Sequence, residues 1–145
     1  METELKHINF SYQTDSGKEY HIPLSYQLFG RELFSAPIIL VNHAFTGNSD
    51  VAGEKGWWKK LIGKNKVINT NQYTILCFNI PGNGYDDFFI KDHEDFTVSD
   101  VANIFLKGLE FLNIKTLHAI IGGSLGGGIG WEMLTKNPHL TEIFI

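Results

Sequence analysis

The chain has little of what would place it outside the cell, in a membrane or on nucleic acid. Cys77 is the single cysteine among 145 residues, so no disulfide can form within the chain, which is typical of a cytoplasmic protein. No run approaches about 18 consecutive apolar residues, and residues 1–7 lack the apolar stretch of a secretory signal, so no membrane partner is expected. The net charge is −4 and Lys and Arg do not cluster, which argues against a nucleic-acid partner.

What the chain does have is apolar sequence in short, separated runs. Hydrophobic residues make up 43% and aromatic residues 13%, which is enough to build a core and excludes a disordered chain. The length corresponds to one domain or to a part of one. Cys77 lies inside one apolar run, where a buried and inert thiol is favoured over a catalytic one.

The hydrophobic pattern predicts strands that alternate with helices. Alternating apolar residues over 5–28, interrupted by a turn at 14–17, predict an antiparallel hairpin. The remaining predicted elements are strands at 37–42, 73–80, 116–121 and 141–145, and helices at 97–112 and 125–136. Thr97 is a candidate N-cap with Asp100 three residues later. This order predicts an α/β fold with a mainly parallel sheet that is covered on both faces.

Ser124 lies in the segment Gly122-Gly123-Ser124-Leu125-Gly126, between a predicted strand and a predicted helix. A G-x-S-x-G pattern in this context is typical of a nucleophile elbow, a sharp turn that presents a serine hydroxyl to a base. Glycine at 122 and 126 removes Cβ atoms that would collide where strand and helix pass closely, and it tolerates strained backbone angles. We therefore predict that Ser124 is a catalytic nucleophile rather than part of a plain glycine-rich turn.

Two further loops are expected beside Ser124. Residues 42–47 and 81–85 also follow predicted parallel strands, and reactive groups gather beyond the carboxyl ends of such strands. Acyl transfer to a serine needs backbone N–H groups that bind the developing oxyanion. We predict that the N–H groups of Leu125, directly after the nucleophile, and of Phe45 form this oxyanion hole.

Several short segments carry a resemblance to a known family. Residues 42–49 read Asn-His-Ala-Phe-Thr-Gly-Asn-Ser, and they precede Gly56-Trp57-Trp58, Leu61-Ile62-Gly63, the run Ile-Asn-Thr-Asn-Gln-Tyr at 68–73, and the Ser124 motif. In this order the segments resemble the homoserine O-acetyltransferase family of the α/β-hydrolase superfamily. The resemblance runs from about residue 20 to residue 145, and the Gly-Trp-Trp and Leu-Ile-Gly segments are more diagnostic than the elbow, which the whole superfamily shares.

This resemblance implies a fold and a reaction. It implies an α/β-hydrolase fold with an N-terminal antiparallel hairpin, in which residues 1–145 are the N-terminal part of a single domain, truncated before the lid and the C-terminal strands. Ser124 would take an acetyl group from acetyl-CoA and pass it to the hydroxyl of homoserine or a similar alcohol, in methionine biosynthesis. Phe45 and Leu125 match the family's oxyanion positions. No bound cofactor and no metal is implied, and a homodimer is suggested by family analogy alone.

The catalytic base is not expected among the histidines of this chain. The superfamily order is serine, acid, histidine, and His139 is the only histidine after Ser124, with no Asp between them. His43 is instead interpreted as a hydrogen-bonding residue that shapes its loop. The resemblance places the catalytic Asp and His downstream of residue 145, so residues 1–145 are expected to be inactive alone.

Other polar and aromatic segments have simpler interpretations. Trp57 and Trp58 are expected to anchor a loop rather than to line an acyl tunnel. The acidic stretch 86–95 lacks metal-ligand spacing and is interpreted as a solvated loop. Asn79 and Asn83 fit substrate contact and turn formation equally well.

Two functions besides acyl transfer stay open from the sequence. The same serine would make the protein an esterase if water were the acceptor. Alternatively, the 145-residue chain is a non-catalytic fragment or partner module that associates through an exposed edge strand.

Overall fold

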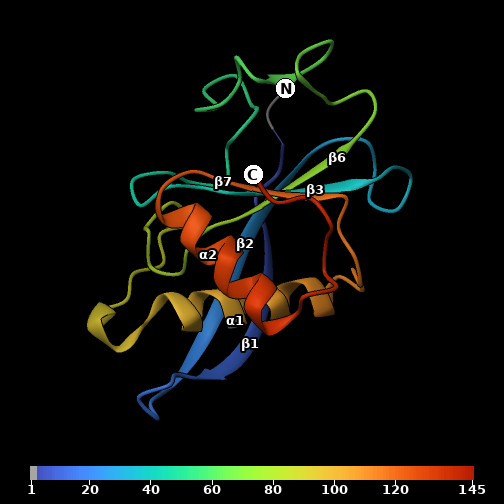
Figure 1. Cartoon of the computed structure of the whole chain (residues 1–145). Helices are drawn as coiled ribbons and strands as arrows, with labels where there is room; N and C mark the ends of the chain where they lie inside the picture. The colour runs from blue at the N-terminus through green and yellow to red at the C-terminus, as the bar shows by residue number, and fades with distance from the viewer. Residues whose placement is uncertain (1–2) are drawn as a thin grey trace.

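The computed structural model describes residues 3–145, and its centre is a five-stranded sheet in the order β1-β2-β6-β3-β7 (Figure 1). Antiparallel pairing joins β1 to β2 and β2 to β6, whereas β6, β3 and β7 run parallel. The mostly parallel sheet with an antiparallel hairpin is thus confirmed. The strands are β1 (Lys6–Gln13), β2 (Glu19–Gly30), β6 (Thr74–Phe78), β3 (Ile38–Asn42) and β7 (Ala119–Gly122).

The expected strand at 141–145 is reduced to a short pairing with β7. A parallel bridge joins Ile120 to Phe144, and the N–H of Ile120 donates to the carbonyl of Ile143 at 3.0 Å. The N–H of Gly122 donates to the carbonyl of Ile145 at 2.9 Å. The tail therefore continues the sheet beyond β7.

Both helices cover the same face of the sheet (Figure 1). The first, α1 (Val98–Phe111), begins with the predicted capping box, because the N–H of Asp100 donates to the hydroxyl of Thr97 and the N–H of Thr97 donates to the carboxylate of Asp100. The second, α2 (Leu125–Lys136), packs beside α1 and against β3 and β7. The apolar core of this face includes the fully buried side chains of Phe78, Phe105 and Ile129.

The opposite face is covered by the segment 49–72, which contains no α-helix. Two short strands that the sequence pattern did not predict, β4 (Ile62–Gly63) and β5 (Ile68–Asn69), pair in parallel there. Val51 and Ile62 pack with inward residues of β3, β6 and β7 in a second, smaller core. A 3-10 turn, η1 (His93–Asp95), precedes α1.

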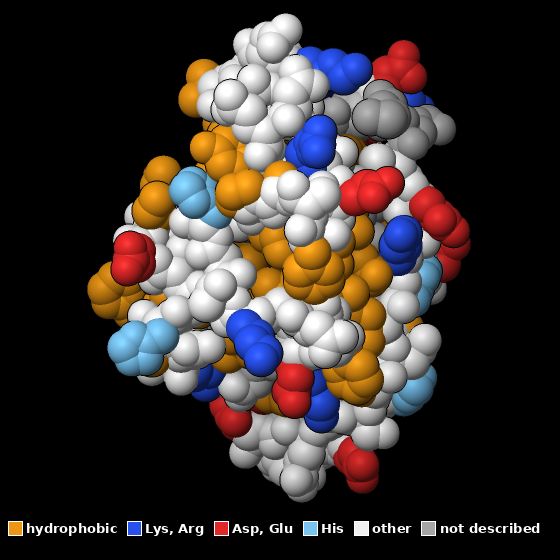
Figure 2. All heavy atoms as spheres, turned by 90° about the vertical axis from the view of Figure 1, so that its right-hand side faces the viewer, with side chains coloured by type: hydrophobic (Ala, Val, Ile, Leu, Met, Phe, Trp, Pro, Cys, Tyr) orange, Lys and Arg blue, Asp and Glu red, His pale blue; other side chains and the backbone are white. Residues whose placement is uncertain are grey.

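The loops after β3 and β7 lie together at one end of the sheet, on the left of Figure 1. The other end, where β3 and β7 begin, faces the viewer in Figure 2, and hydrophobic side chains are visible in its centre among scattered charged ones. Across residues 3–145 the longest helix has 14 residues, and none of the helices there has the length and apolar character to span a membrane.

Candidate active site

Ser124 lies in the turn between the end of β7 at Gly122 and the start of α2 at Leu125. Its backbone angles are φ 53° and ψ −121°, and conformations of this kind cost a non-glycine residue about 1–3 kcal/mol. Ser124 is exposed. The predicted strand–turn–helix context is therefore present, and it exposes the serine at the carboxyl end of the parallel strands.

Two glycines allow the chain to pass itself closely at this turn. A Cβ at Gly122 would overlap the carbonyl oxygen of Gly126, and a Cβ at Gly126 would overlap the carbonyl oxygen of Asn42 at the end of β3. Both obstacles are backbone atoms, which cannot rotate away as a side chain would. The spacing of the motif thus has the steric cause that the sequence analysis gave it, and α2 approaches β3 because residue 126 has no side chain.

The loop after β3 brings another backbone N–H to the same edge of the sheet. Residues 44–47 form a turn, which the N–H of Gly47 closes by donating to the carbonyl of Ala44 at 2.9 Å. Phe45 lies in this turn and is 78% exposed. Within residues 3–145, neither the N–H of Phe45 nor the N–H of Leu125 donates to another group. Both donors are free to bind an oxygen atom.

A cavity of about 590 Å³ lies between this loop, the loop after β6 and the beginnings of both helices. Phe45 and Leu125 both contribute to its wall, so the two residues with free N–H groups border one space. The wall is otherwise mainly apolar, with Ile80, Pro81, Ile90, Phe96, Val101 and Ile129. An apolar wall that includes two residues with free N–H donors suits an uncharged acyl group whose carbonyl oxygen is held.

His43 is completely buried directly behind the turn. Its Nδ1 lies 2.6 Å from the carbonyl oxygen of Ala44, and the N–H of Ile80 donates to its Nε2 at 3.0 Å. Burial lowers the pKa of the imidazole, although its hydrogen bond to Ala44 acts in the opposite direction. His43 is therefore a neutral structural residue that ties the loop after β3 to the loop after β6, which confirms its interpretation as a hydrogen-bonding residue.

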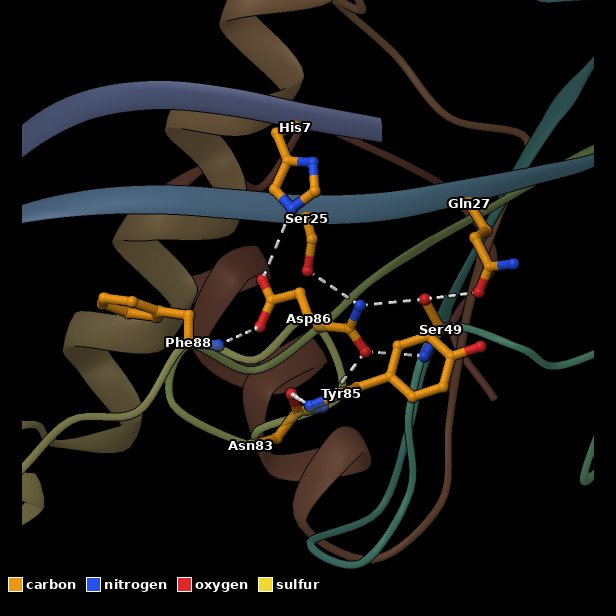
Figure 3. Close-up of polar contacts among 9 residues, drawn as sticks. His7, Ser25, Gln27, Ser49, Asn83, Tyr85, Asp86 and Phe88 are labelled. Carbon is orange, nitrogen blue, oxygen red and sulfur yellow. Dashed lines mark hydrogen bonds and ion pairs between the residues drawn. The ribbon is translucent and has the colours of Figure 1, made fainter. Parts of the chain in front are cut away.

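Uncharged polar side chains lie beneath the same loop, and we call them the amide–serine network: Ser25, Gln27, Ser49, Asn79 and Asn83. The first four are at most 5% exposed. Asn79 accepts from the N–H of Ser49 at 2.8 Å and from Nδ2 of Asn83 at 3.1 Å, and it donates to the hydroxyls of Ser25 and Ser49, each at 2.9 Å. Ser49 in turn donates to Gln27 at 2.7 Å (Figure 3). The network fixes the position of the chain just after the turn that carries Phe45.

This network was not predicted from the sequence, although two of its members, Asn79 and Asn83, were candidate site residues. Asn79 is a buried structural residue, whereas Asn83 both donates to Asn79 and borders the cavity. Polar residues at Ser25 and Gln27, within the otherwise apolar and aromatic run 22–29, are a signal that could have indicated buried hydrogen bonds. The pattern carries no information on which partners they find.

The part of the chain that the structure describes brings no base to Ser124. Within residues 3–145, no imidazole or carboxylate is hydrogen-bonded to its hydroxyl. His93 is exposed at the cavity wall, and His118 stacks on Tyr73 with ring centroids 5.2 Å apart. His139 is exposed beyond the end of α2. None of the described histidines takes the role of the catalytic base in this arrangement.

The aromatic pair and the cysteine have the structural roles that were predicted. Trp57 donates from its indole N–H to the carbonyl of Asn48 at 2.9 Å, and both Trp57 and Trp58 pack against the smaller core. They anchor the segment 49–72 on the sheet. Cys77 is fully buried, and burial raises the pKa of its thiol far above the ordinary value, so it stays protonated and inert.

The acidic stretch 86–95 is not the fully solvated loop that was expected. The side chain of Asp86 is only 5% exposed; it accepts from the N–H of Phe88 at 3.2 Å and lies 3.8 Å from Nε2 of His7 (Figure 3). Asp95 accepts from Lys18 at 2.8 Å and from Tyr20 at 2.6 Å. These carboxylates hold the loop against β1 and β2. Residues 3–145 contain no cluster of three or more His, Cys, Asp or Glu side chains suited to a metal ion.

These features coincide with those of a known family. Residues 37–141 match the family model described as the alpha/beta hydrolase fold. The chain belongs to the α/β-hydrolase family.

Within this fold, the chain is similar to homoserine O-acetyltransferases. It is 34% identical to the homoserine O-acetyltransferase of Methanobrevibacter ruminantium, over 98% of this chain and 33% of that protein. It is 31% identical to that of Corynebacterium diphtheriae, over 89% of this chain and 37% of that protein. The chain thus spans about a third of the length of these curated relatives.

Solved structures that superpose on this chain include proteins named as acetyltransferases and proteins named as esterases. A homoserine O-acetyltransferase from Bacillus anthracis superposes with a TM-score of 0.88 at 26% identity, over 99% of this chain and 46% of that one. Esterase E22 superposes with a TM-score of 0.83 at 25% identity, over 97% of this chain and 46% of that one. The fold is therefore common to an acyltransferase and to an esterase.

Proposed function

We propose that this chain is the nucleophile-bearing part of an O-acyltransferase, with Ser124 as the residue that is acylated. The acyl donor in this proposal is acetyl-CoA, and the acceptor is the hydroxyl of homoserine or a similar alcohol, as the names of the curated relatives suggest. By the same analogy, the enzyme acts in methionine biosynthesis in the cytoplasm. A homodimer is the assembly that family analogy favours.

One observation carries the proposal. Ser124 is exposed and directly precedes Leu125. Leu125 and Phe45 both line one cavity, and within residues 3–145 the backbone N–H of neither residue donates to another group. A candidate nucleophile that is followed by one unoccupied N–H donor, with the residue of a second such donor on the same cavity wall, matches what a tetrahedral intermediate requires. The strain at Ser124 also favours this role, because such strain persists at sites where it serves function.

The chemistry follows in two balanced steps. The oxygen of Ser124 attacks the thioester carbonyl, its proton passes to a base, the new C–O bond forms and the C–S bond breaks, so that CoA leaves as the thiol after protonation. The alcohol then attacks the acyl-serine ester and loses its proton to the same base, and Ser124 regains one. In both steps the negative oxygen is held by the N–H groups of Phe45 and Leu125, each worth about 3–4 kcal/mol to the transition state.

The base and its orienting acid are proposed to come from a part of the longer protein outside residues 1–145. None of the described histidines is hydrogen-bonded to Ser124, and the relatives are about three times longer than this chain. We accordingly propose that residues 1–145 alone turn over no substrate.

The test is a mass measurement on the longer enzyme after incubation with acetyl-CoA. Trapping of one acetyl group on the peptide that contains Ser124 is expected, with CoA release that depends on homoserine. Ser124→Ala removes the nucleophile and is expected to lower turnover by about 10⁴-fold or more. Transfer at the wild-type rate by Ser124→Ala would refute the proposed nucleophile.

A second candidate is an esterase that uses the same serine. It is favoured by the superposition on esterase E22, whose identity to this chain is close to that of the acetyltransferase structure. The two functions differ in the acceptor, so the acetyl-CoA experiment separates them. CoA release at the same rate with and without homoserine would identify water as the acceptor and exclude the transferase.

A further inference from the structure

We propose that His43 is a positioning residue that orients the oxyanion-binding N–H of Phe45, through the carbonyl of the peptide unit that both groups share. The expected effect of His43 on kcat rests on the proposed acyl-transfer function. The orientation of the Phe45 N–H by His43 is argued from the hydrogen bonds of His43 and does not depend on that function.

The tautomer of His43 follows from its partners. The backbone N–H of Ile80 can only donate, and it points at Nε2 at 3.0 Å, so Nε2 carries no proton. The carbonyl of Ala44 can only accept, and it lies 2.6 Å from Nδ1. His43 is therefore neutral with its proton on Nδ1, and the imidazole donates to Ala44.

The carbonyl of Ala44 and the N–H of Phe45 belong to one planar trans peptide, in which the two bonds point in opposite directions. Fixing the carbonyl therefore fixes the direction of the N–H. Two donors hold this carbonyl: Nδ1 of His43 from the side chain and the N–H of Gly47 at 2.9 Å. Hydrogen bonds at the carbonyl also polarise the peptide, which makes its N–H a stronger donor.

The imidazole is held tightly enough to act in this way. A Cβ at Gly47 would lie 2.9 Å from Cβ and 3.2 Å from Nδ1 of His43, so the turn closes directly around the ring. On the other side, a Cβ at Gly126 would lie 2.7 Å from the backbone oxygen of His43, so the start of α2 packs against the same residue. His43 thus lies between the turn at residues 44–47, which carries Phe45, and the turn that carries Ser124. Its position therefore affects where the N–H groups of Phe45 and Leu125 lie relative to each other.

Two substitutions separate the bond to Ala44 from the bond to Ile80. In His43→Asn, the amide nitrogen takes the place of Nδ1 and is able to donate to Ala44, but nothing reaches Ile80. In His43→Gln, the amide group takes the place of Nε2 and is able to accept from Ile80, but the donor to Ala44 is lost. If His43 only tied the two loops together, the two variants would be affected alike, or Asn more than Gln.

The kinetic test measures kcat and KM for acyl transfer in the longer enzyme. We expect His43→Gln to lower kcat by about 10–100-fold with KM changed by less than about twofold, because a misdirected N–H weakens binding of the transition state only. We expect His43→Asn to stay within about fivefold of the wild-type kcat. A kcat for His43→Gln equal to or above that of His43→Asn, or a loss confined to KM, would overturn the inference.

Nuclear magnetic resonance tests the geometry without activity. In ¹⁵N-labelled residues 1–145, the wild-type imidazole of His43 is expected to show a protonated Nδ1 and an unprotonated Nε2, and finding the opposite tautomer would overturn the inference even if both variants fail to fold. The amide resonance of Phe45 is expected to shift more in His43→Gln than in His43→Asn. A wild-type enzyme without acyl transfer would refute the proposed function, and the resonances would then decide the inference about His43.

Discussion

Two polar clusters flank the hairpin strands. In both, hydrogen bonds offset the cost of burying polar side chains, but the two clusters differ in charge. The amide–serine network beneath the candidate site consists of neutral groups that satisfy one another. The other cluster, which we call the Asp100 cluster, consists of Tyr12, Asp15, Thr97, Asp100 and Asn103 and joins the hairpin to the start of α1.

The Asp100 cluster is built around one buried carboxylate. Oδ1 of Asp100 accepts from the hydroxyl of Tyr12 at 2.8 Å and from the N–H of Asp15 at 2.9 Å. Oδ2 accepts from the N–H and the hydroxyl of Thr97 at 2.9 and 3.0 Å. Burial acts to raise the pKa of Asp100, but these hydrogen bonds outweigh it and lower the pKa below its ordinary value.

Both clusters contribute a residue to the cavity wall, Asn83 and Thr97, but they are expected to respond differently to pH. The network under the loop that carries Phe45 contains no group that titrates between pH 2 and 12, so its geometry is insensitive to pH. The Asp100 cluster, whose member Thr97 borders the same cavity as Phe45 and Leu125, gains strength from charge and is sensitive to pH. The predictions below test this contrast through stability, beginning with the largest expected effect.

Asn79→Leu is expected to be the most destabilising of these changes. It removes four hydrogen bonds at once and leaves buried groups of Ser25 and Ser49 without partners. Because each unsatisfied buried group costs about 1–3 kcal/mol, we expect the free energy of unfolding to fall by about 3 kcal/mol or more, as measured by urea denaturation of residues 1–145. The same loss is expected at pH 4 and at pH 8.

The matched control is Asn71→Leu, at an exposed position in a turn. We expect a change within about 0.5 kcal/mol, as is usual for surface substitutions. Equal effects of the two substitutions would show that the amide–serine network contributes nothing special to stability.

The contrast between the clusters is also a contrast in what the sequence could predict. Thr97 and Asp100 are three positions apart, and their capping box was predicted because a helix start places such residues together. The elbow at Ser124 was predicted from a similarly local motif, because Gly122 and Gly126 approach each other within five residues, although Gly126 also approaches the distant Asn42. Ser25 and Asn79 are 54 positions apart, and their contact exists only after β2 and β6 have paired.

The segment 49–72 escaped prediction on similar physical grounds. β4 and β5 have only two residues each, too few for an alternating pattern, and they are held by contacts with the sheet rather than by their own propensity. The second hydrogen bond of His43 likewise needs the loop after β6 beside it. The fold class and the predicted nucleophile could be read locally, whereas the supports of the site depend on contacts between distant residues.

Asp100→Asn is expected to have the second-largest effect. The substituted amide places an NH₂ group opposite two donors, so at pH 7 we expect a loss of about 2 kcal/mol in the free energy of unfolding. The pKa of Asp100 is lower in the folded than in the unfolded chain, so its contribution is present above about pH 4 and is lost as the pH falls through the folded value.

A urea titration at several pH values checks this dependence. The gap between wild type and Asp100→Asn is expected to narrow as the pH falls below about 4 and through the lowered folded pKa of Asp100, while the gap for Asn79→Leu stays constant. Asp92→Asn, at an exposed position without a side-chain capping bond, serves as the control and is expected to change little. A gap for Asp100→Asn that is independent of pH would mean that the carboxylate charge is not what stabilises the cluster.

Tyr12→Phe is expected to have the smallest effect and the opposite dependence on pH. It deletes the hydrogen bond to Asp100 and the one received from Asn103 at 3.2 Å, so about 1 kcal/mol is expected at pH 7. Burial raises the pKa of Tyr12 to about 12, a hydrogen bond from Asn103 partly opposes this, and the proximity of Asp100 adds to it. Folding therefore favours the neutral phenol, and this contribution is present below pH 10 and lost as the pH rises toward 12.

Between pH 10 and 12 the wild type is expected to lose stability more steeply than Tyr12→Phe. Tyr73→Phe is the control, because the ring of Tyr73 stacks on His118 outside the cluster. Parallel curves for wild type and Tyr12→Phe would show that the phenol of Tyr12 titrates as it does in the unfolded chain.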